Sequence, residues 1–571
     1  MAGQIRYRST RGGSSGLTFE QAVFEGLAPD GGLMVPDKVP DVSKTYKGWS
    51  KLSFADLAFE IASLFCSADE IPHADLREIL NRSYKSFTHP EVVPSVKVGD
   101  MYIMELFHGP TFAFKDVALQ ALGNIYEYFL KRNTRRLTVI GATSGDTGSA
   151  AIYGLRGKEN VECFILFPEG RVSKIQQQQM TSVLDPNVHC VAIKGTFDDC
   201  QDIVKALFSE LDFKKQYGLG AVNSINWARI MFQITYYFYT YFKLCPQCDG
   251  ELSFSVPTGN FGDILAGYYA KRMGLPVRHL VCATNSNDIL HRFFTSGNYD
   301  KRTVEQTCTP SMDIGISSNF ERYLFYLFGE DPKKLAEAME GFKKIGKLGV
   351  TPEELQRARQ DFLSGVAPED AIGEAIRSWD QLHGYCLDPH TACGVHAANE
   401  LRESSGWPQV PHHAMVVLGT AHPAKFNEIV NEALGRPPPM PEGLARVQHA
   451  PTRFEVLPNA VDSIRAYVEA TVAQREISKD GAACAPSALL GSTPKGPGPP
   501  PIQALAEANG PAQAEQHQTT VVVSMGVEPK AEGPSSGVVP EPCTVGLALP
   551  VAAAGQPCDC WGGLWKRFFG N

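Results

Sequence analysis

Hydrophobic and polar positions alternate in blocks along residues 99–440. Short apolar runs, typical of buried strands, are separated by longer stretches with helical spacing. This alternation indicates crossover units, so we expect an α/β fold with mainly parallel sheets flanked by helices. The runs expected to form strands are residues 137–140, 161–167, 252–256, 280–283 and 414–418.

Other stretches have the spacing of helices. Residues 54–65 are amphipathic, and residues 331–380 carry Glu and Lys at helical intervals. The apolar stretch 230–242 is interrupted by polar residues and is shorter than the roughly 20 residues that cross a bilayer. It therefore predicts a buried helix, and we expect no membrane span. The glutamine run at 176–179 predicts an exposed helix.

Composition narrows the class of protein. A chain of 571 residues predicts two or three domains, and a net charge of −9 offers no basic surface for nucleic acid. Fourteen irregularly spaced cysteines indicate reduced thiols. The N-terminus lacks the apolar core of a secretory signal, so we expect a cytoplasmic protein. Mitochondrial import is the alternative, because Arg6, Arg8 and Arg11 precede the first acidic residue, Glu20.

The composition changes near Gln474. Residues 474–571 are rich in Pro, Gly, Ala and Ser, with few long apolar side chains to offset the entropy of ordering, so we expect a disordered tail. It ends in WGGLWKRFFGN, an aromatic and basic cluster. Contact with a membrane or a partner is one interpretation of this cluster, and a terminus without function is the one we favour.

One lysine occupies an unusual position. The segment HGPTFAFKD (108–116) places Lys115 between aromatic residues, just before a helical pattern that starts at Val117. Apolar surroundings and the positive end of a helix both disfavour the ammonium form and lower the lysine pKa. A neutral amine condenses with a carbonyl to form a Schiff base. Taken alone, a snorkelling or ion-paired lysine explains the segment as well.

Two further segments run from a strand through a polar turn into a helix. They are GATSGDTG (141–148) and PTGNFGD (257–263). Helix starts of this kind present backbone N–H groups to an anion. Neither segment is a Walker loop or a dinucleotide fingerprint, and each alone is also explained as an ordinary turn with a cap. Together with Lys115 they predict a phosphorylated aldehyde cofactor and an anionic substrate.

Longer blocks of the sequence resemble a known family. HGPTFAFKD, ATSGDTGSAA, PTGNFGD and LGTAHPAKF are similar to the signature blocks of threonine synthases. The likeness runs from about residue 5 to 470 and is strongest to the vertebrate threonine synthase-like branch. It implies a fold-type II enzyme, similar to the tryptophan synthase β subunit, with pyridoxal 5′-phosphate (PLP) as cofactor. It also implies an N-terminal domain at 1–98 and a catalytic region at 99–473 with a subdomain around 126–222.

The resemblance assigns the cofactor residues. Lys115 would carry PLP as a Schiff base and then move protons at Cα and Cβ of the substrate. Thr420 would be the partner of the pyridine nitrogen, which tempers the electron-withdrawing strength of the ring. The residues implied to hold the cofactor phosphate are Gly259, Asn260, Phe261, Gly262 and Asp263.

The resemblance also implies substrate contacts. Asn226 and Arg229 are candidate ligands of the substrate phosphate, although a structural ion pair explains Arg229 equally well. The SGDTG block resembles the substrate loop of this fold type. Its residues expected to meet the substrate and the cofactor are Thr143, Ser144, Asp146 and Thr147.

Three functions remain open. A phospho-lyase would eliminate phosphate from O-phosphothreonine and O-phosphohomoserine to give 2-oxobutanoate, ammonia and phosphate. The likeness to the vertebrate branch favours it, since vertebrates do not make threonine. A threonine synthase would instead add water at Cβ. A noncatalytic binding or signalling protein is the third option, and intact Lys115, GNFGD and Thr420 oppose it.

The sequence predicts neither a metal site nor a macromolecular partner. Cys245 and Cys248 have the spacing of half a zinc site, but no second pair follows at a suitable distance, so we expect no metal. The expected partner is a small phosphorylated amino acid, with no nucleic acid and no membrane. A monomer and a homodimer both fit the sequence.

Overall fold

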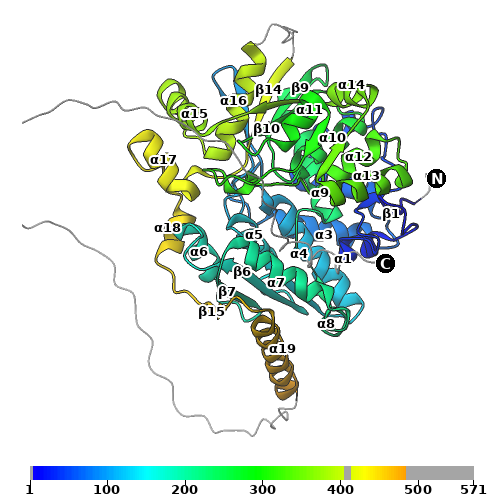
Figure 1. Cartoon of the computed structure of the whole chain (residues 1–571), viewed down its shortest axis with the longest axis vertical. Coiled ribbons are helices and arrows are strands. Elements are labelled where there is room, and N and C mark those ends of the chain that lie inside the picture. The colour runs from blue at the N-terminus through cyan, green and yellow to red at the C-terminus, as the bar shows by residue number, and fades with distance from the viewer. Residues whose placement is uncertain (1–3, 221, 404–412, 484–571) are drawn as a thin grey trace, which may run out of the picture. The chain divides into compact units, whose positions relative to one another are not determined.

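The computed structural model describes residues 4–220, 222–403 and 413–483. Two large sheets dominate this part of the chain, and in Figure 1 they lie in the upper and lower parts of the view. The six-stranded sheet has the order β13-β10-β9-β14-β4-β3, and all its pairings are parallel except that of β3 with β4. Its strands are β3 (Ser95–Val98), β4 (Met101–Glu105), β9 (Glu251–Pro257), β10 (Val277–Thr284), β13 (Phe362–Val366) and β14 (His413–Gly419).

The five-stranded sheet has the order β15-β7-β6-β5-β8 and is parallel throughout. Its outer strand β15 comes from the C-terminal part of the chain, more than 230 residues after β8. The strands of this sheet are β5 (Leu137–Ala142), β6 (Val161–Pro168), β7 (Val188–Lys194), β8 (Leu219–Gly220) and β15 (Glu455–Pro458).

The predicted strands are confirmed. All five expected runs lie within β5, β6, β9, β10 and β14, and the parallel pairing confirms the α/β class. The prediction of helices alone over 331–380 was wrong, because this segment also holds β12 (Lys347–Gly349) and β13. Strand β13, with the sequence FLSGV, is short and has a glycine in its interior, so its pattern carries little strand signal.

Smaller elements complete the sheets. The predicted N-terminal domain contains an antiparallel pair of strands, and β3 at its end already belongs to the six-stranded sheet. A second antiparallel pair joins β11 to β12. The remaining strands are β1 (Tyr7–Ser9), β2 (Met34–Pro36) and β11 (Asn298–Asp300), and the short 3₁₀ helices are η1 (Tyr46–Trp49), η2 (Pro310–Met312) and η3 (Pro423–Phe426).

Helices surround the sheets (Figure 1). Side chains of both helices and strands form the largest hydrophobic cluster of the described residues. The N-terminal helices are α1 (Phe19–Glu25), α2 (Phe54–Phe65) and α3 (His73–Tyr84). Those of the middle of the chain are α4 (Lys115–Arg132), α5 (Asp146–Leu155), α6 (Lys174–Thr181), α7 (Phe197–Ser209), α8 (Leu211–Tyr217), α9 (Trp227–Leu244), α10 (Gly262–Arg272) and α11 (Ile289–Ser296). Those that follow are α12 (Phe320–Leu327), α13 (Pro332–Ile345), α14 (Pro352–Asp361), α15 (Glu369–His383), α16 (Pro389–Glu403), α17 (Asn427–Leu434), α18 (Glu442–Gln448) and α19 (Val461–Ala483).

Helix α9 is the buried helix predicted from the apolar stretch at 230–242. Sixteen of its 18 residues are buried, and it packs against α2, α4 and α10. A helix that is apolar on every side is stable only when neighbours cover all of its faces. Within the part of the chain that the structure describes, no helix has the length and apolar character to cross a membrane.

Two glycines let α4 and α5 approach each other closely. A Cβ atom on Gly123 of α4 would lie 1.9 Å from the carbonyl oxygen of Gly154 on α5, and one on Gly154 would lie 2.6 Å from the carbonyl oxygen of Leu119. Only hydrogen fits at both positions. This close contact fixes the two helices whose first residues are Lys115 and Asp146.

Candidate active site

Lys115 begins α4 and is 7% exposed. Its Nζ atom lies 5.1 Å from the centre of the Phe114 ring. Burial lowers the pKa of Lys115, and the nearby cations Lys425 and Arg229 add to this, whereas Asp146 acts in the opposite direction. The net effect favours the neutral amine, as the aromatic setting of the segment predicted.

Asp146 is the carboxylate at the centre of the site. Its Oδ2 atom lies 3.3 Å from Lys115 Nζ, and its Oδ1 atom lies 2.7 Å from Lys425 Nζ. Gln176 Nε2 donates to the same Oδ1 at 2.9 Å. Burial raises the pKa of Asp146, but Lys425 and Lys115 outweigh this and hold it well below its usual range. Asp146 is therefore an ionised carboxylate shared by two lysines.

The glutamines of α6 correct one expectation. The run at 176–179 was predicted to lie on an exposed helix, but Gln176 and Gln179 are buried. Gln179 donates to the carbonyl oxygen of Thr111 at 3.1 Å, and Gln176 contacts Asp146. The short α6 thus presents one polar face to the site, which a run of four identical residues could not reveal.

The SGDTG turn connects β5 to α5. Thr143 Oγ1 accepts hydrogen bonds from the backbone N–H groups of Gly145 at 3.0 Å and Gly148 at 2.9 Å, so this hydroxyl shapes the turn. Gly145 has a φ of 145°, and a Cβ there would lie 2.5 Å from the Gln176 side chain. Ser144 and Thr147 are partly exposed at the same turn. The turn brings Asp146 to Lys115, and the substrate contacts of all four predicted residues stay predictions.

The GNFGD turn connects β9 to α10. A Cβ on Gly259 would lie 2.9 Å from the carbonyl oxygen of Ser311, so this turn has no room for a side chain there. Ser317 Oγ donates to the Gly259 carbonyl at 2.8 Å, and Ser318 Oγ donates to Asn260 Oδ1 at 3.0 Å. Phe261, with a φ of 57°, packs its ring among Phe294, Phe320, Tyr323 and Phe362. These contacts hold the first turn of α10, beginning at Gly262, in a fixed position.

The side chain of Asp263 is turned toward α9. Its Oδ1 atom accepts hydrogen bonds from Tyr236 Oη at 2.5 Å and Tyr237 Oη at 2.9 Å. Burial raises the pKa of Asp263 to about 6, although both tyrosine hydrogen bonds act to lower it. A carboxylate repels a phosphate, so in this turn the backbone amides are the groups suited to an anion.

Thr420 follows β14 and is buried. Its backbone N–H donates to Thr391 Oγ1 at 3.1 Å, and its carbonyl oxygen accepts from the N–H of Phe114 at 2.8 Å, one residue before Lys115. Among the described residues its Oγ1 atom has no hydrogen-bond partner. A buried hydroxyl without a partner is costly unless a ligand supplies one.

Arg229 and Asn226 differ in whether their side-chain polar atoms already have hydrogen-bond partners. Arg229 is 5% exposed, and its Nη1 atom has no partner in the described part of the chain. Burial lowers its pKa to about 10. Asn226 caps α9 by accepting from the N–H of Ala228 at 3.0 Å, and it donates to the carbonyl of Val23 and to Tyr126 Oη. Arg229 can therefore bind an added anion, whereas the side chain of Asn226 is already engaged.

These features fit the cofactor that the resemblance implied. A buried lysine with a lowered pKa suits an aldehyde, and the partnerless Thr420 hydroxyl suits a ring nitrogen. The close approach at Gly259 keeps side chains away from the start of α10, where a phosphate would bind. We therefore find the residues compatible with bound PLP.

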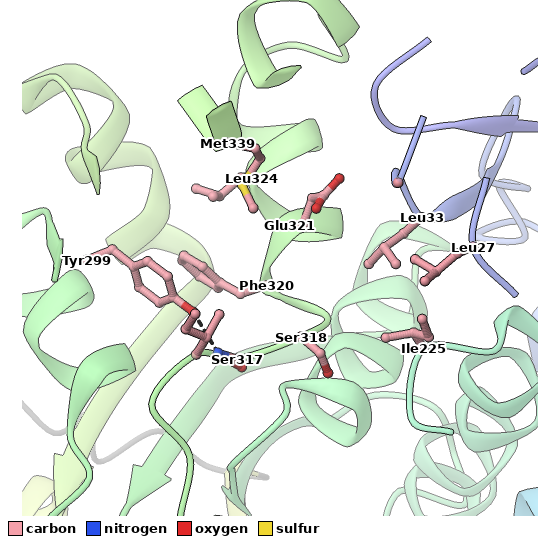
Figure 2. Close-up of a pocket in the computed structure, with 12 residues that line it drawn as sticks. Leu27, Leu33, Ile225, Tyr299, Ser317, Ser318, Phe320, Glu321, Leu324 and Met339 are labelled. Carbon is pink, nitrogen blue, oxygen red and sulfur yellow. Dashed lines mark hydrogen bonds between the residues drawn. The ribbon is translucent and has the colours of Figure 1, made fainter. Parts of the chain in front are cut away.

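An apolar cavity of about 220 Å³ adjoins the GNFGD turn (Figure 2). Figure 2 shows Ser317 and Ser318 on its wall, together with Tyr299, whose hydroxyl accepts from the Ser317 N–H at 2.7 Å. The same two serines support Gly259 and Asn260. Neither Lys115 nor Thr420 is among the described residues that line the cavity.

Sequence reasoning missed three polar groups of the site. Ser311 Oγ lies 3.5 Å from Lys115 Nζ, and the Ser311 N–H donates to His390 Nε2 at 3.4 Å. Lys425 is fully buried beside Asp146. Lys425 lies in LGTAHPAKF, a block that carried the family likeness, but only Thr420 of that block was assigned a role.

Cys245 and Cys248 are free thiols at the end of α9, and burial raises the pKa of both. Across residues 4–220, 222–403 and 413–483, no three His, Cys, Asp or Glu side chains are grouped as metal ligands would be.

Comparisons with known proteins identify the family. Three family models match: "Threonine synthase N terminus" over residues 6–84, "Pyridoxal-phosphate dependent enzyme" over 90–354, and "Threonine synthase, C-terminal" over 391–468. The chain is 50% identical over 467 residues to the threonine synthase of Schizosaccharomyces pombe, covering 76% of this chain and 90% of that protein. It is 37% identical over 481 residues to the threonine synthase-like 2 protein of Xenopus laevis, covering 83% of this chain and 100% of that protein.

A solved structure supports the same assignment. The PLP-bound threonine synthase of Brucella melitensis superposes with a TM-score of 0.78 at 45% identity, covering 82% of this chain and 99% of that one. The chain therefore belongs to the threonine synthase family and is a PLP-dependent lyase of fold-type II.

Proposed function

We propose that the enzyme eliminates phosphate from O-phosphohomoserine and adds water at Cβ, giving threonine. The bound cofactor supplies an electron-withdrawing ring that makes the protons of the attached amino acid acidic. The observation that supports this reaction class is the buried Lys115 amine beside Asp146, together with the Arg229 Nη1 atom, to which no described residue is hydrogen-bonded. The first group moves protons, and the second binds a leaving phosphate.

Lys115 is the proposed general base and acid. Burial lowers its pKa, which favours the neutral amine, and a neutral amine can take a proton from Cα and return it later. In the proposed reaction one proton leaves Cα, a second leaves Cβ, and phosphate departs from Cγ. Water then adds its hydroxyl at Cβ, and the three protons released from Cα, Cβ and water go to Cα, Cγ and the departing phosphate. Burial of the site limits stray water, so this water must be held in place.

The other site residues hold the reactants. We assign the cofactor phosphate to the turn of Gly259, Asn260, Phe261, Gly262 and Asp263, and the ring nitrogen to Thr420. The substrate is assigned to the SGDTG turn through Thr143, Ser144, Asp146 and Thr147. For the substrate phosphate, Arg229 is the stronger candidate. Asn226 would have to give up a protein partner to bind it.

A phospho-lyase is the second candidate, and it was the function favoured from the sequence. A phospho-lyase also requires removal of the Cα proton, but it needs no water positioned at Cβ. The enamine that it releases hydrolyses to 2-oxobutanoate and ammonia. The match to threonine synthase-like 2 over its full length supports keeping it. The higher identity to threonine synthases, 50% against 37%, supports the synthase outcome.

Product analysis distinguishes the two reactions. The purified holoenzyme is incubated separately with O-phosphohomoserine and O-phosphothreonine, and phosphate, threonine, 2-oxobutanoate and ammonia are quantified. We expect equal amounts of phosphate and threonine from O-phosphohomoserine. Equal amounts of phosphate, 2-oxobutanoate and ammonia would favour the phospho-lyase. Release of no phosphate from either substrate would refute both candidates, and a Lys115→Ala protein provides the background rate.

A further inference from the structure

Lys425 is a second lysine in the site, and nothing in the proposed reaction uses it. It lies in η3, five residues after Thr420, and is 0% exposed. Its Nζ atom lies 2.7 Å from Asp146 Oδ1 and donates to the carbonyl oxygen of Thr111 at 2.7 Å. A fully buried ammonium is retained in a protein only when oxygen atoms surround it in this way.

These contacts tie together three segments that carry the chemistry. Thr111 belongs to the loop before Lys115, Asp146 to the SGDTG turn, and Lys425 to the segment after Thr420. Thr111 in turn holds Asp116, because its N–H and Oγ1 donate to the two carboxylate oxygens at 2.8 and 2.9 Å. Lys425 thus lies near two carboxylates, of which only Asp146 contacts it directly.

The two lysines bind Asp146 on different oxygens, Lys115 at 3.3 Å and Lys425 at 2.7 Å. Lys115 cannot be a permanent partner. When it bonds to the cofactor aldehyde, two amine hydrogens leave with the aldehyde oxygen as water, so the nitrogen no longer carries the three hydrogens of an ammonium. A buried carboxylate that loses its only cation is strongly destabilised.

We propose that Lys425 is the permanent counter-cation of Asp146, a positioning residue that keeps the SGDTG carboxylate paired whether Lys115 is free or bonded to the cofactor. With Lys425 present, Asp146 does not need Lys115, and the Lys115 amine is free to react. The proposal depends on the cofactor that the family supplies and not on the choice of substrate, so the product assay above can fail without affecting it.

The test is a double-mutant cycle with Lys425→Gln and Asp146→Asn. Glutamine keeps a donor for the Thr111 carbonyl but removes the charge, and asparagine removes the carboxylate that needs it. The readout is attachment of PLP to the apoprotein across pH 6–10, measured as the fraction trapped by borohydride. The charged groups that face Lys115 are Asp146, Lys425 and Arg229. A Lys158→Met variant controls for the loss of a partly buried lysine, which pairs with Glu127 outside the site.

In the Lys425→Gln protein, Asp146 pairs with Lys115 alone and holds it as an ammonium. We expect the pH of half-maximal attachment to rise by about one unit or more. In the double variant both charges are gone, and the midpoint should return close to the wild-type value. Lys158→Met should leave the midpoint unchanged.

Two results would overturn the proposal. One is a Lys425→Gln protein whose pH of half-maximal PLP attachment equals that of wild type. The other is a double variant whose pH of half-maximal attachment stays as high as that of Lys425→Gln. If Lys425→Gln does not fold, the double variant decides: recovery of folding supports charge compensation, and failure of both shows that Lys425 acts only as a structural link to Thr111.

Discussion

Thr420 Oγ1 is a buried hydroxyl oxygen to which no described residue is hydrogen-bonded. A Thr420→Val substitution keeps the shape and removes only this oxygen. Because no protein hydrogen bond is lost, we expect the free energy of unfolding of the apoprotein to change by less than about 1 kcal/mol. Loss of one hydrogen bond to the cofactor should lower turnover about tenfold. Chemical denaturation and steady-state kinetics on the same preparation check both values.

The matched control is Thr391→Val, which removes a hydroxyl that bonds to Asp388 and accepts the Thr420 N–H. This variant should lose stability as well as turnover. If Thr420→Val lost stability to the same extent while keeping full turnover, the assignment of Thr420 to the cofactor would be wrong.

Among single residues, the sequence predicted those whose role follows from the neighbouring residues in the same motif. Lys115 could be found because an aromatic, helix-start position lowers a lysine pKa, and the structure has it buried in that setting. Lys425 and Gln176 could not be found in the same way. Their roles depend on Asp146, which lies 279 residues before Lys425 and 30 residues before Gln176, and only the fold brings them together.

At the scale of elements, α9 and α10 are joined through one carboxyl group. Tyr236 and Tyr237 of α9 both donate to Asp263 of α10, whose pKa is raised to about 6 from an ordinary value of 3.8. The folded state therefore holds this proton more tightly than the unfolded state. The contribution of Asp263 to stability is fully present below pH 4 and is lost as the pH rises through 6.

An Asp263→Asn variant removes this titration and keeps an oxygen that accepts from the tyrosines. We expect its unfolding free energy to improve relative to wild type by about 2 kcal/mol between pH 4 and pH 7. Denaturation curves of both proteins at half-unit pH intervals provide the measurement. A constant difference across this range would show that Asp263 titrates normally in the folded protein.

Regular elements with strong patterns were predicted well. The helix at 54–65 matches α2 residue for residue, and the buried helix at 230–242 lies within α9. Strand β13 was missed because a short edge strand has few buried positions to form a pattern. Strand β15 was missed because it lies 261 residues after the end of β7 and is stabilised by that long-range pairing.

At the scale of the whole molecule, the predicted boundary at residue 474 cuts a helix. Helix α19 continues to Ala483, its residues Ile464 and Val468 are buried in the core of the five-stranded sheet, and Arg475 forms an ion pair with Glu162 at 2.9 Å. The predicted disorder of the rest of the tail lies outside the described residues. The end of α19 at Ala483 is therefore the position at which the tail can be removed without cutting a helix.

We expect the chain truncated after Ala483 to keep its unfolding temperature and turnover, because the removed segment has few long apolar side chains. The control is truncation after Arg453, which removes β15 and α19 and exposes the core residues of the five-stranded sheet that Ile464 and Val468 cover. That protein should unfold at a much lower temperature. A large loss of stability in the first truncation would show that the tail is part of the folded enzyme.

Two lysines, Lys115 and Lys425, contact Asp146. Which of them bonds to the cofactor decides where the active site lies. Reduction of the holoenzyme with borohydride, followed by proteolysis and mass spectrometry, locates the bond directly. We predict that the phosphopyridoxyl group is on Lys115 and that a Lys115→Ala protein takes up none. Label on Lys425, or undiminished label in the Lys115→Ala protein, would contradict the assignment of the active site.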